Sequence, residues 1–67
     1  MKKFNLFINY IEVSKNTRTI IASGNTPFNT RANSYEEART QALEHAQALA
    51  RDYDKQEIYF FFLIGRP

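Results

Sequence analysis

The sequence predicts an α+β fold, in which one helix packs on one face of a three- to four-stranded antiparallel sheet, in the order β-β-α-β. Three observations predict it. Apolar residues recur at every second position over 3–13, and a continuous apolar run follows within 56–64. A β-branched run covers 17–23, and one capped helical segment begins at Ser34. At 67 residues the chain has room for a single domain, which we expect to span residues 1–67.

Residues 3–13, KFNLFINYIEV, are predicted to form the first strand. One face of this strand is apolar and consists of Phe4, Leu6, Ile8 and Tyr10. The other face is mixed and consists of Asn5, Phe7, Asn9 and Ile11. The Ser and Asn of segment 14–17 favour a turn, so residues 17–23 should return as the second strand of an antiparallel hairpin.

The segment 24–27, GNTP, predicts a break in the second strand. Gly24 and Asn25 permit positive φ, and Pro27 has no N–H to donate to a strand ladder. Residues 28–32 then either resume the second strand beyond a bulge or form a short edge strand of their own.

A helix is predicted to begin after Ser34, because Ser34 and Glu37 match a capping box. Its apolar stripe is mostly alanine and consists of Tyr35, Ala38, Ala42, Ala46, Leu49 and Tyr53. The stripe stops near Tyr53, where we expect the helix to end. Alanines let a helix lie close to a sheet, so the sheet must supply the large core residues.

Residues 56–64, QEIYFFFLI, are predicted to form the last strand. A right-handed crossover through the helix places this strand beside the first and antiparallel to it, in the strand order 2-1-3. Matching the two strands turns four side chains toward the helix: Ile58, Phe60, Phe62 and Ile64. The opposite face keeps Tyr59, Phe61 and Leu63. An error of one residue in register would exchange the two sets.

The composition argues against catalysis and against cofactor binding. Cysteine is absent and His45 is the only histidine, which leaves no ligand set for zinc. We expect His45 on the polar flank of the helix and Asp52 and Asp54 at its hydrated end. The two glycines do not form a phosphate-binding loop. We therefore predict a non-enzyme that binds no metal and no cofactor.

The hydropathy pattern predicts a soluble protein, and the absence of cysteine is compatible with a reducing cytoplasm. The net charge is +2 and the basic residues are dispersed, which is not the pattern of a dedicated nucleic-acid binder. The most apolar run, residues 58–65, is far shorter than the ~20 residues that a membrane-spanning helix needs.

The sheet face without a helix is the main functional prediction. Large apolar groups on an uncovered face commonly mark a partner surface. The alternative is that the termini or the segment 24–31 fold over this face, with Phe28 as a plug. On the partner hypothesis, the contact residues are Phe7, Asn9, Ile11, Tyr59 and Phe61, with Lys3, Arg31 and Arg66 as a basic rim.

Three kinds of partner fit such a face. A protein suits it because Tyr and Phe are enriched at protein interfaces. Single-stranded nucleic acid could stack on the aromatic rings, but the chain lacks the second helix and the glycine-bearing motif of RNA-recognition domains. A homodimer would bury the aromatic face against itself. We favour a protein partner.

The segment TRANSYEEARTQALEHAQALA, residues 30–50, resembles small phage proteins of β-β-α-β build that inhibit host machinery. These include a phage inhibitor of bacterial RNA polymerase and several anti-CRISPR proteins. The outline also resembles HicB-type antitoxins, but the turn region ASGNTPF, residues 22–28, departs from their DLPGC-like pattern. The resemblance covers residues 4–64 in topology and residues 34–38 in motif, and it carries over no site residue.

The resemblance implies an inhibitor encoded by a phage or mobile element. Its partner would be a bacterial host protein, such as a CRISPR effector or RNA polymerase, in the cytoplasm of the host. The implied mechanism is occlusion, in which the small domain covers a functional surface and excludes its normal ligand.

Overall fold

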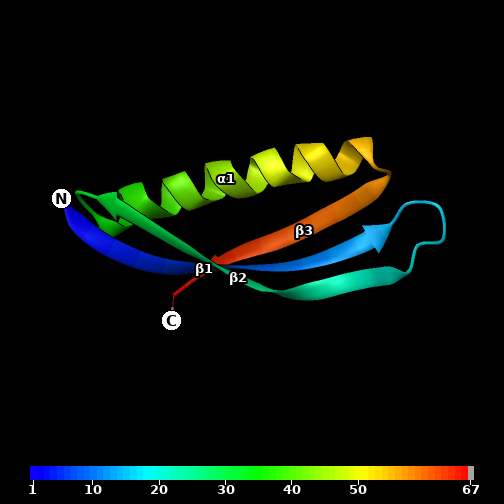
Figure 1. Ribbon diagram of the computed structural model, residues 1–67, viewed down its shortest axis with the longest axis horizontal. Helices are drawn as coiled ribbons and strands as arrows, with labels where there is room; N and C mark the ends of the chain where they lie inside the picture. Colours follow the sequence, from blue (N-terminus) through cyan, green and yellow to red (C-terminus); the bar gives the residue numbers. More distant parts are fainter. Residues whose placement is uncertain (67) are drawn as a thin grey trace.

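The computed structural model describes residues 1–66 and has the predicted α+β fold (Figure 1). Along the chain it contains β1 (Lys2–Ser14), β2 (Ile20–Ala32), α1 (Tyr35–Lys55) and β3 (Ile58–Gly65). The three strands form one antiparallel sheet in the order β2-β1-β3, which confirms the predicted topology. Figure 1 shows α1 lying along one side of this sheet.

The predicted break at residues 24–27 is wrong. β2 runs without interruption through Gly24 and Pro27, and each of these residues has a partner in β1. The irregularity lies nearer the hairpin loop, where Ala22 pairs with Glu12 but Ile20 pairs with Val13, so that Ile21 is an extra residue. Residues 28–32 are therefore the end of the second strand and not a separate strand.

The direction of the backbone hydrogen bonds explains why β2 tolerates Pro27. The Lys15 N–H donates to the Glu57 carbonyl at 3.0 Å, just beyond the last β1–β3 pair. Because hydrogen-bonding direction alternates along a strand, the odd-numbered residues of β1 bond toward β3 and the even-numbered ones toward β2. Pro27 faces the odd-numbered Phe7, so its missing N–H lies at the free edge of β2.

The same alternation describes the free edge of β3. Its odd-numbered residues bond toward β1, so its even-numbered residues direct their N–H and C=O groups away from the sheet. These outward-directed residues are Ile58, Phe60, Phe62 and Ile64.

The core lies between the alanine stripe and the middle of the sheet. The buried side chains are Leu6, Ile8, Ala32, Ala38, Ala42 and Ala46. The helix begins as predicted, since the Ser34 side chain accepts a hydrogen bond from the Glu37 N–H at 3.2 Å. It ends two residues later than predicted, at Lys55, where the Gln56 and Glu57 amides bond back to the carbonyls of the last helical turn.

An aromatic cluster extends the core toward the C-terminal end of α1. The Phe60 ring stacks on Tyr53 of the helix at 5.1 Å and on Tyr10 of β1 at 5.5 Å. Phe28 also lies on the helix side, where its ring is 5.2 Å from that of His45. The faces of β3 are therefore as predicted, and Phe28 does not cover the opposite face.

The molecule is long and thin for its mass. It measures 44 × 21 × 13 Å, and its radius of gyration of 13.1 Å exceeds the roughly 11 Å expected for a compact chain of this length. Its accessible surface is 4834 Å², against about 4,400 Å² expected for a monomer of this mass. The fold thus leaves more surface in water than a typical monomer does. No helix within residues 1–66 is both long and apolar enough to cross a membrane.

Candidate functional site

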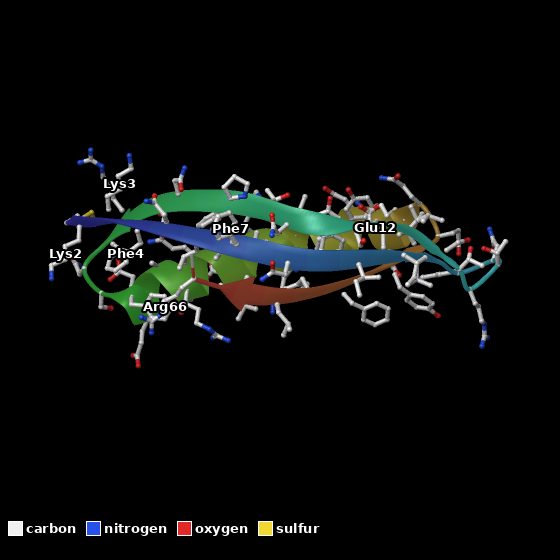
Figure 2. The ribbon with its side chains drawn as sticks, turned by 90° about the horizontal axis from the view of Figure 1, so that it is seen from below. Lys2, Lys3, Phe4, Phe7, Glu12 and Arg66 are labelled. Carbon is white, nitrogen blue, oxygen red and sulfur yellow. The ribbon has the colours of Figure 1, made fainter. Side chains whose placement is uncertain are left out.

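The candidate site is the side of the sheet that faces away from α1, which we call the open face (Figure 2). It is built by the odd-numbered residues of β1 and β3 and by the residues of β2 that pair with them. Successive side chains of a strand alternate between faces, so the pairing register brings side chains from three segments into one surface.

One half of the open face is apolar. Ile11 lies opposite Phe61 in the β1–β3 pair, and the next pair toward the loop joins Val13 and Tyr59. The exposed fractions are 42% for Ile11, 57% for Phe61 and 76% for Leu63. The Tyr59 and Phe61 rings are tilted against each other, with centroids 5.9 Å apart. We call this surface the apolar half, and it consists of Ile11, Ile20, Tyr59, Phe61 and Leu63.

A groove of about 550 Å³ lies in this region. It is lined by Asn9, Tyr10, Ile11, Ser23, Gly24, Phe61, Phe62 and Leu63. Most of these residues have side chains on the open face. On the helix side, Tyr10 already occupies the space beside Gly24, since its hydroxyl is 3.3 Å from where a Cβ of that glycine would lie. The groove could accept a single apolar side chain from a partner.

Phe7 and Asn9 continue the open face toward the middle of the sheet. Phe7 is half-buried between Pro27 of β2 and Gly65 of β3, its two register partners. Asn9 is exposed, and its amide nitrogen lies over Gly65, 3.0 Å from where a Cβ would be. These two residues form the boundary between the apolar half and the polar remainder of the face.

The predicted basic residues gather at the opposite end from the apolar half. Lys3 and Arg31 are register partners on the open face. Lys3 and Ile11 lie on the same strand, about 26 Å apart at ~3.3 Å per residue. Figure 2 shows Lys2, Lys3 and Arg66 at this end. Arg66, however, packs its guanidinium over the Tyr35 ring at 4.1 Å, on the helix side. The structure therefore brings seven of the eight predicted contact residues onto the open face and leaves out Arg66.

Tyr59 is held in place by a residue of the hairpin loop. Lys15 forms an ion pair with Asp54 at the end of α1, and its ammonium lies 5.0 Å from the centre of the Tyr59 ring. The hydrogen bond that the Lys15 ammonium donates to the Asp54 carboxylate raises the pKa of Lys15 above its ordinary value of 10.5. Lys15 thus stays charged at neutral pH and fixes one end of the apolar half.

Sequence reasoning missed Ile20 as a member of this surface. Ile20 is 65% exposed and pairs with Val13, so it lies on the open face. If side chains alternated strictly from Ala22 onward, Ile20 would lie on the helix side of the sheet. The extra residue at Ile21 shifts the register and places Ile20 on the open face. Leu63 was assigned to the correct face, but its exposure makes it a stronger contact residue than the sequence indicated.

The described residues contain little that suggests chemistry. Within residues 1–66, no group of three or more His, Cys, Asp or Glu side chains is arranged to hold a metal ion. His45 is exposed on α1, and Asp54 is engaged by Lys15.

Comparison of the chain with models of known protein families, with curated proteins and with solved structures finds no significant match.

Proposed function

We propose that this chain is a protein-binding inhibitor that acts by covering a functional surface of its partner, with no chemistry of its own. The observation that carries the proposal is the apolar half of the open face. A contiguous apolar patch with a polar border is the usual mark of an interaction site on a small protein. The helix packs on the opposite face and leaves these side chains exposed in the single chain.

The apolar half has the composition of a binding hot spot. Aromatic side chains lose little conformational entropy when they are buried, and they dominate the energy of many interfaces. Phe61 and Tyr59 supply two such rings, and the adjacent groove offers a pocket for an anchor from the partner. Because Lys15 already packs on Tyr59, the Tyr59 side chain is partly ordered in the free chain and loses less conformational entropy on binding.

The distribution of charge supports a protein partner over single-stranded nucleic acid. Bases stacked on Phe61 would need free basic side chains near the ring to hold their phosphates. Of the basic residues predicted to contact a partner, Lys3 and Arg31 lie about 26 Å away along the strand, and Lys15, beside Tyr59, is paired with Asp54. A separate basic end is better suited to an acidic patch on a protein, where it would raise the association rate.

The resemblance of residues 30–50 to phage inhibitors suggests the kind of partner. On that basis we propose a bacterial enzyme complex, such as a CRISPR effector or RNA polymerase, as the target, and a phage or mobile element as the source. One copy of the chain would then cover one functional surface of the target.

The test is affinity capture from bacterial lysate with the wild type and three variants. Phe61→Asp and Ile11→Asp each place a charge in the apolar half, on different strands. Ala48→Asp is the matched control, because Ala48 is exposed on α1, away from the open face. We expect the wild type and Ala48→Asp to capture the same protein and the other two variants to lose it. The captured enzyme should then lose its activity at stoichiometric amounts of the chain.

Two results would overturn the proposal. One is capture that does not depend on Phe61 or Ile11. The other is tight binding of single-stranded oligonucleotides with a steep dependence on salt, measured by fluorescence titration at two salt concentrations.

A further inference from the structure

We infer that the free edge of β3 is a self-pairing surface, through which two copies of this chain join their sheets into one six-stranded antiparallel sheet. The occupant of this edge is a second copy of the chain, bound by backbone hydrogen bonds. The inference does not rest on the proposed function, because it concerns the backbone groups at the edge of β3, whereas the open face is formed by side chains.

The two edges of the sheet differ in how they are protected. Natural edge strands usually carry proline, charge or a bulge that prevents pairing with another chain. β2 has Pro27 directed to its free edge and a bulge at Ile21. β3 has neither, and residues 58–64 contain no charge, proline or glycine. An unprotected edge of this kind is a template for another strand.

The outward-directed groups of β3 favour one register, the one that pairs all four of them with one another. Ile58, Phe60, Phe62 and Ile64 present their N–H and C=O groups at the edge, so these residues must form the hydrogen-bonded pairs with the second copy. A two-fold axis at Phe61 pairs Phe60 with Phe62 of the second copy and Ile58 with its Ile64. This register uses every outward-directed residue of β3.

The same pairing would complete the thin core. The four outward-directed residues turn their side chains toward α1, yet all four are only half-buried. A groove of about 490 Å³ also separates the edge of β3 from the C-terminal half of α1, with Ala50, Asp54 and Ile58 among its lining residues. A second β3 would cover this exposed apolar edge. The surplus of roughly 400 Å² in the accessible surface of the single chain is consistent with such a partner.

The charges flanking β3 are also compatible with antiparallel pairing. Glu57 precedes the strand and Arg66 follows it, and both side chains are exposed. With the axis at Phe61, Gly65 of the second copy lies opposite Glu57, so Arg66 of the second copy comes next to Glu57. An acidic and a basic residue therefore flank both ends of the paired strands, although the Arg66 guanidinium itself packs on Tyr35 in the single chain.

The absence of native cysteine allows a direct test. The axis at Phe61 places residue 61 opposite its own copy in a non-hydrogen-bonded pair, with Cα atoms about 4.5 Å apart, which is within the range of a disulfide. In Phe61→Cys, added oxidised glutathione should therefore convert the two thiols into an intermolecular disulfide and be reduced to two glutathione thiols. The matched control is Leu63→Cys. Leu63 lies on the same strand and face as Phe61 and is more exposed, but with the axis at Phe61 the two copies of residue 63 would lie about 13 Å apart.

We expect Phe61→Cys to oxidise to a dimer roughly tenfold faster than Leu63→Cys. A mixture of Tyr59→Cys and Leu63→Cys should give a mixed disulfide, because these positions face each other across the axis. The wild type should sediment at twice the 7.9 kDa of the single chain. Oxidation of Leu63→Cys as fast as Phe61→Cys would overturn the inference, as would a wild type that remains at 7.9 kDa at every concentration.

Discussion

Ile11 of β1 and Phe61 of β3 are register partners whose side chains both point away from α1 and remain largely exposed. The adjacent residue Phe60 points the other way and stacks between Tyr10 and Tyr53. Two neighbouring phenylalanines in the same strand thus have opposite roles, one in the core and one on the surface. This difference can be measured directly.

We expect Phe60→Ala to lower the free energy of unfolding by about 3 kcal/mol, because it removes the ring at the centre of the aromatic cluster. Phe61→Ala should cost less than about 1 kcal/mol, since the Phe61 ring is mostly in water. Urea denaturation of both variants measures the difference. If Phe61→Ala is the more damaging of the two, the assignment of the faces of β3 is wrong.

The alanine stripe of α1 sets the distance between the helix and the sheet. Ala42→Leu forces a large side chain into a buried position, and we expect it to cost about 1–3 kcal/mol. Ala48→Leu is the matched control on the exposed face of the same helix, and it should change stability by no more than about 0.5 kcal/mol. Thermal unfolding followed by circular dichroism separates the two. Equal midpoints would mean that the helix does not lie close to the sheet.

The N-terminal cap of α1 depends on the Ser34 hydroxyl, which accepts a hydrogen bond from the Glu37 amide. We expect Ser34→Ala to lower the free energy of unfolding by about 1 kcal/mol and Ser34→Asp to retain most of the stability, because aspartate also caps helices well. Chemical denaturation of the two variants checks this. A similar loss in both would show that the hydroxyl geometry, and not capping in general, is required.

The Lys15–Asp54 pair should stabilise the fold in a pH-dependent manner. The hydrogen bond to Asp54 raises the pKa of Lys15 in the folded state above 10.5, so the folded chain holds this proton more tightly than the unfolded chain. The stabilisation is therefore fully present below pH 10.5 and disappears as the pH rises through the higher, folded-state pKa.

We expect the unfolding midpoint of Lys15→Gln to lie below that of the wild type by a constant amount from about pH 6 to pH 9, and the two to converge above pH 10.5. Asp54→Asn removes the other partner, and adding it to Lys15→Gln should have little further effect. If the unfolding midpoints of the wild type and Lys15→Gln became equal near neutral pH, the stabilisation would not come from the charged Lys15 paired with Asp54.

The sequence was sufficient to predict the strand order and the faces of β1, whereas the faces of β3 were predicted only by matching that strand to β1. Residues 58–64 are all apolar, so the pattern of β3 does not choose between Phe60 and Phe61. Because side chains alternate along a strand and one helix covers one face, the two residues had to differ, and the register with β1 decides which is buried. The alanine positions of α1 likewise revealed its buried face and its close approach to the sheet.

The continuity of β2 could not be predicted in the same way. Gly24 and Pro27 are usual signals for a break in a strand. A strand can include a proline where the missing N–H lies at an edge that has no neighbouring strand. That edge is decided only when the sheet is assembled. Ile20 lies on the open face because of the bulge at Ile21. Arg66 lies on the helix side because its guanidinium packs on Tyr35. Neither the bulge nor the contact with Tyr35 can be recognised from the neighbouring residues in the sequence.

Pro27 also determines how far an assembly of this chain can grow. In a dimer joined through β3, both outer edges of the sheet are β2 strands, and each carries the ring of Pro27 in place of an outward amide. A further copy would find no continuous ladder on either side. The proposed assembly would therefore close at two chains and would not extend into a fibre, although the most apolar strand of the protein would lie at its centre.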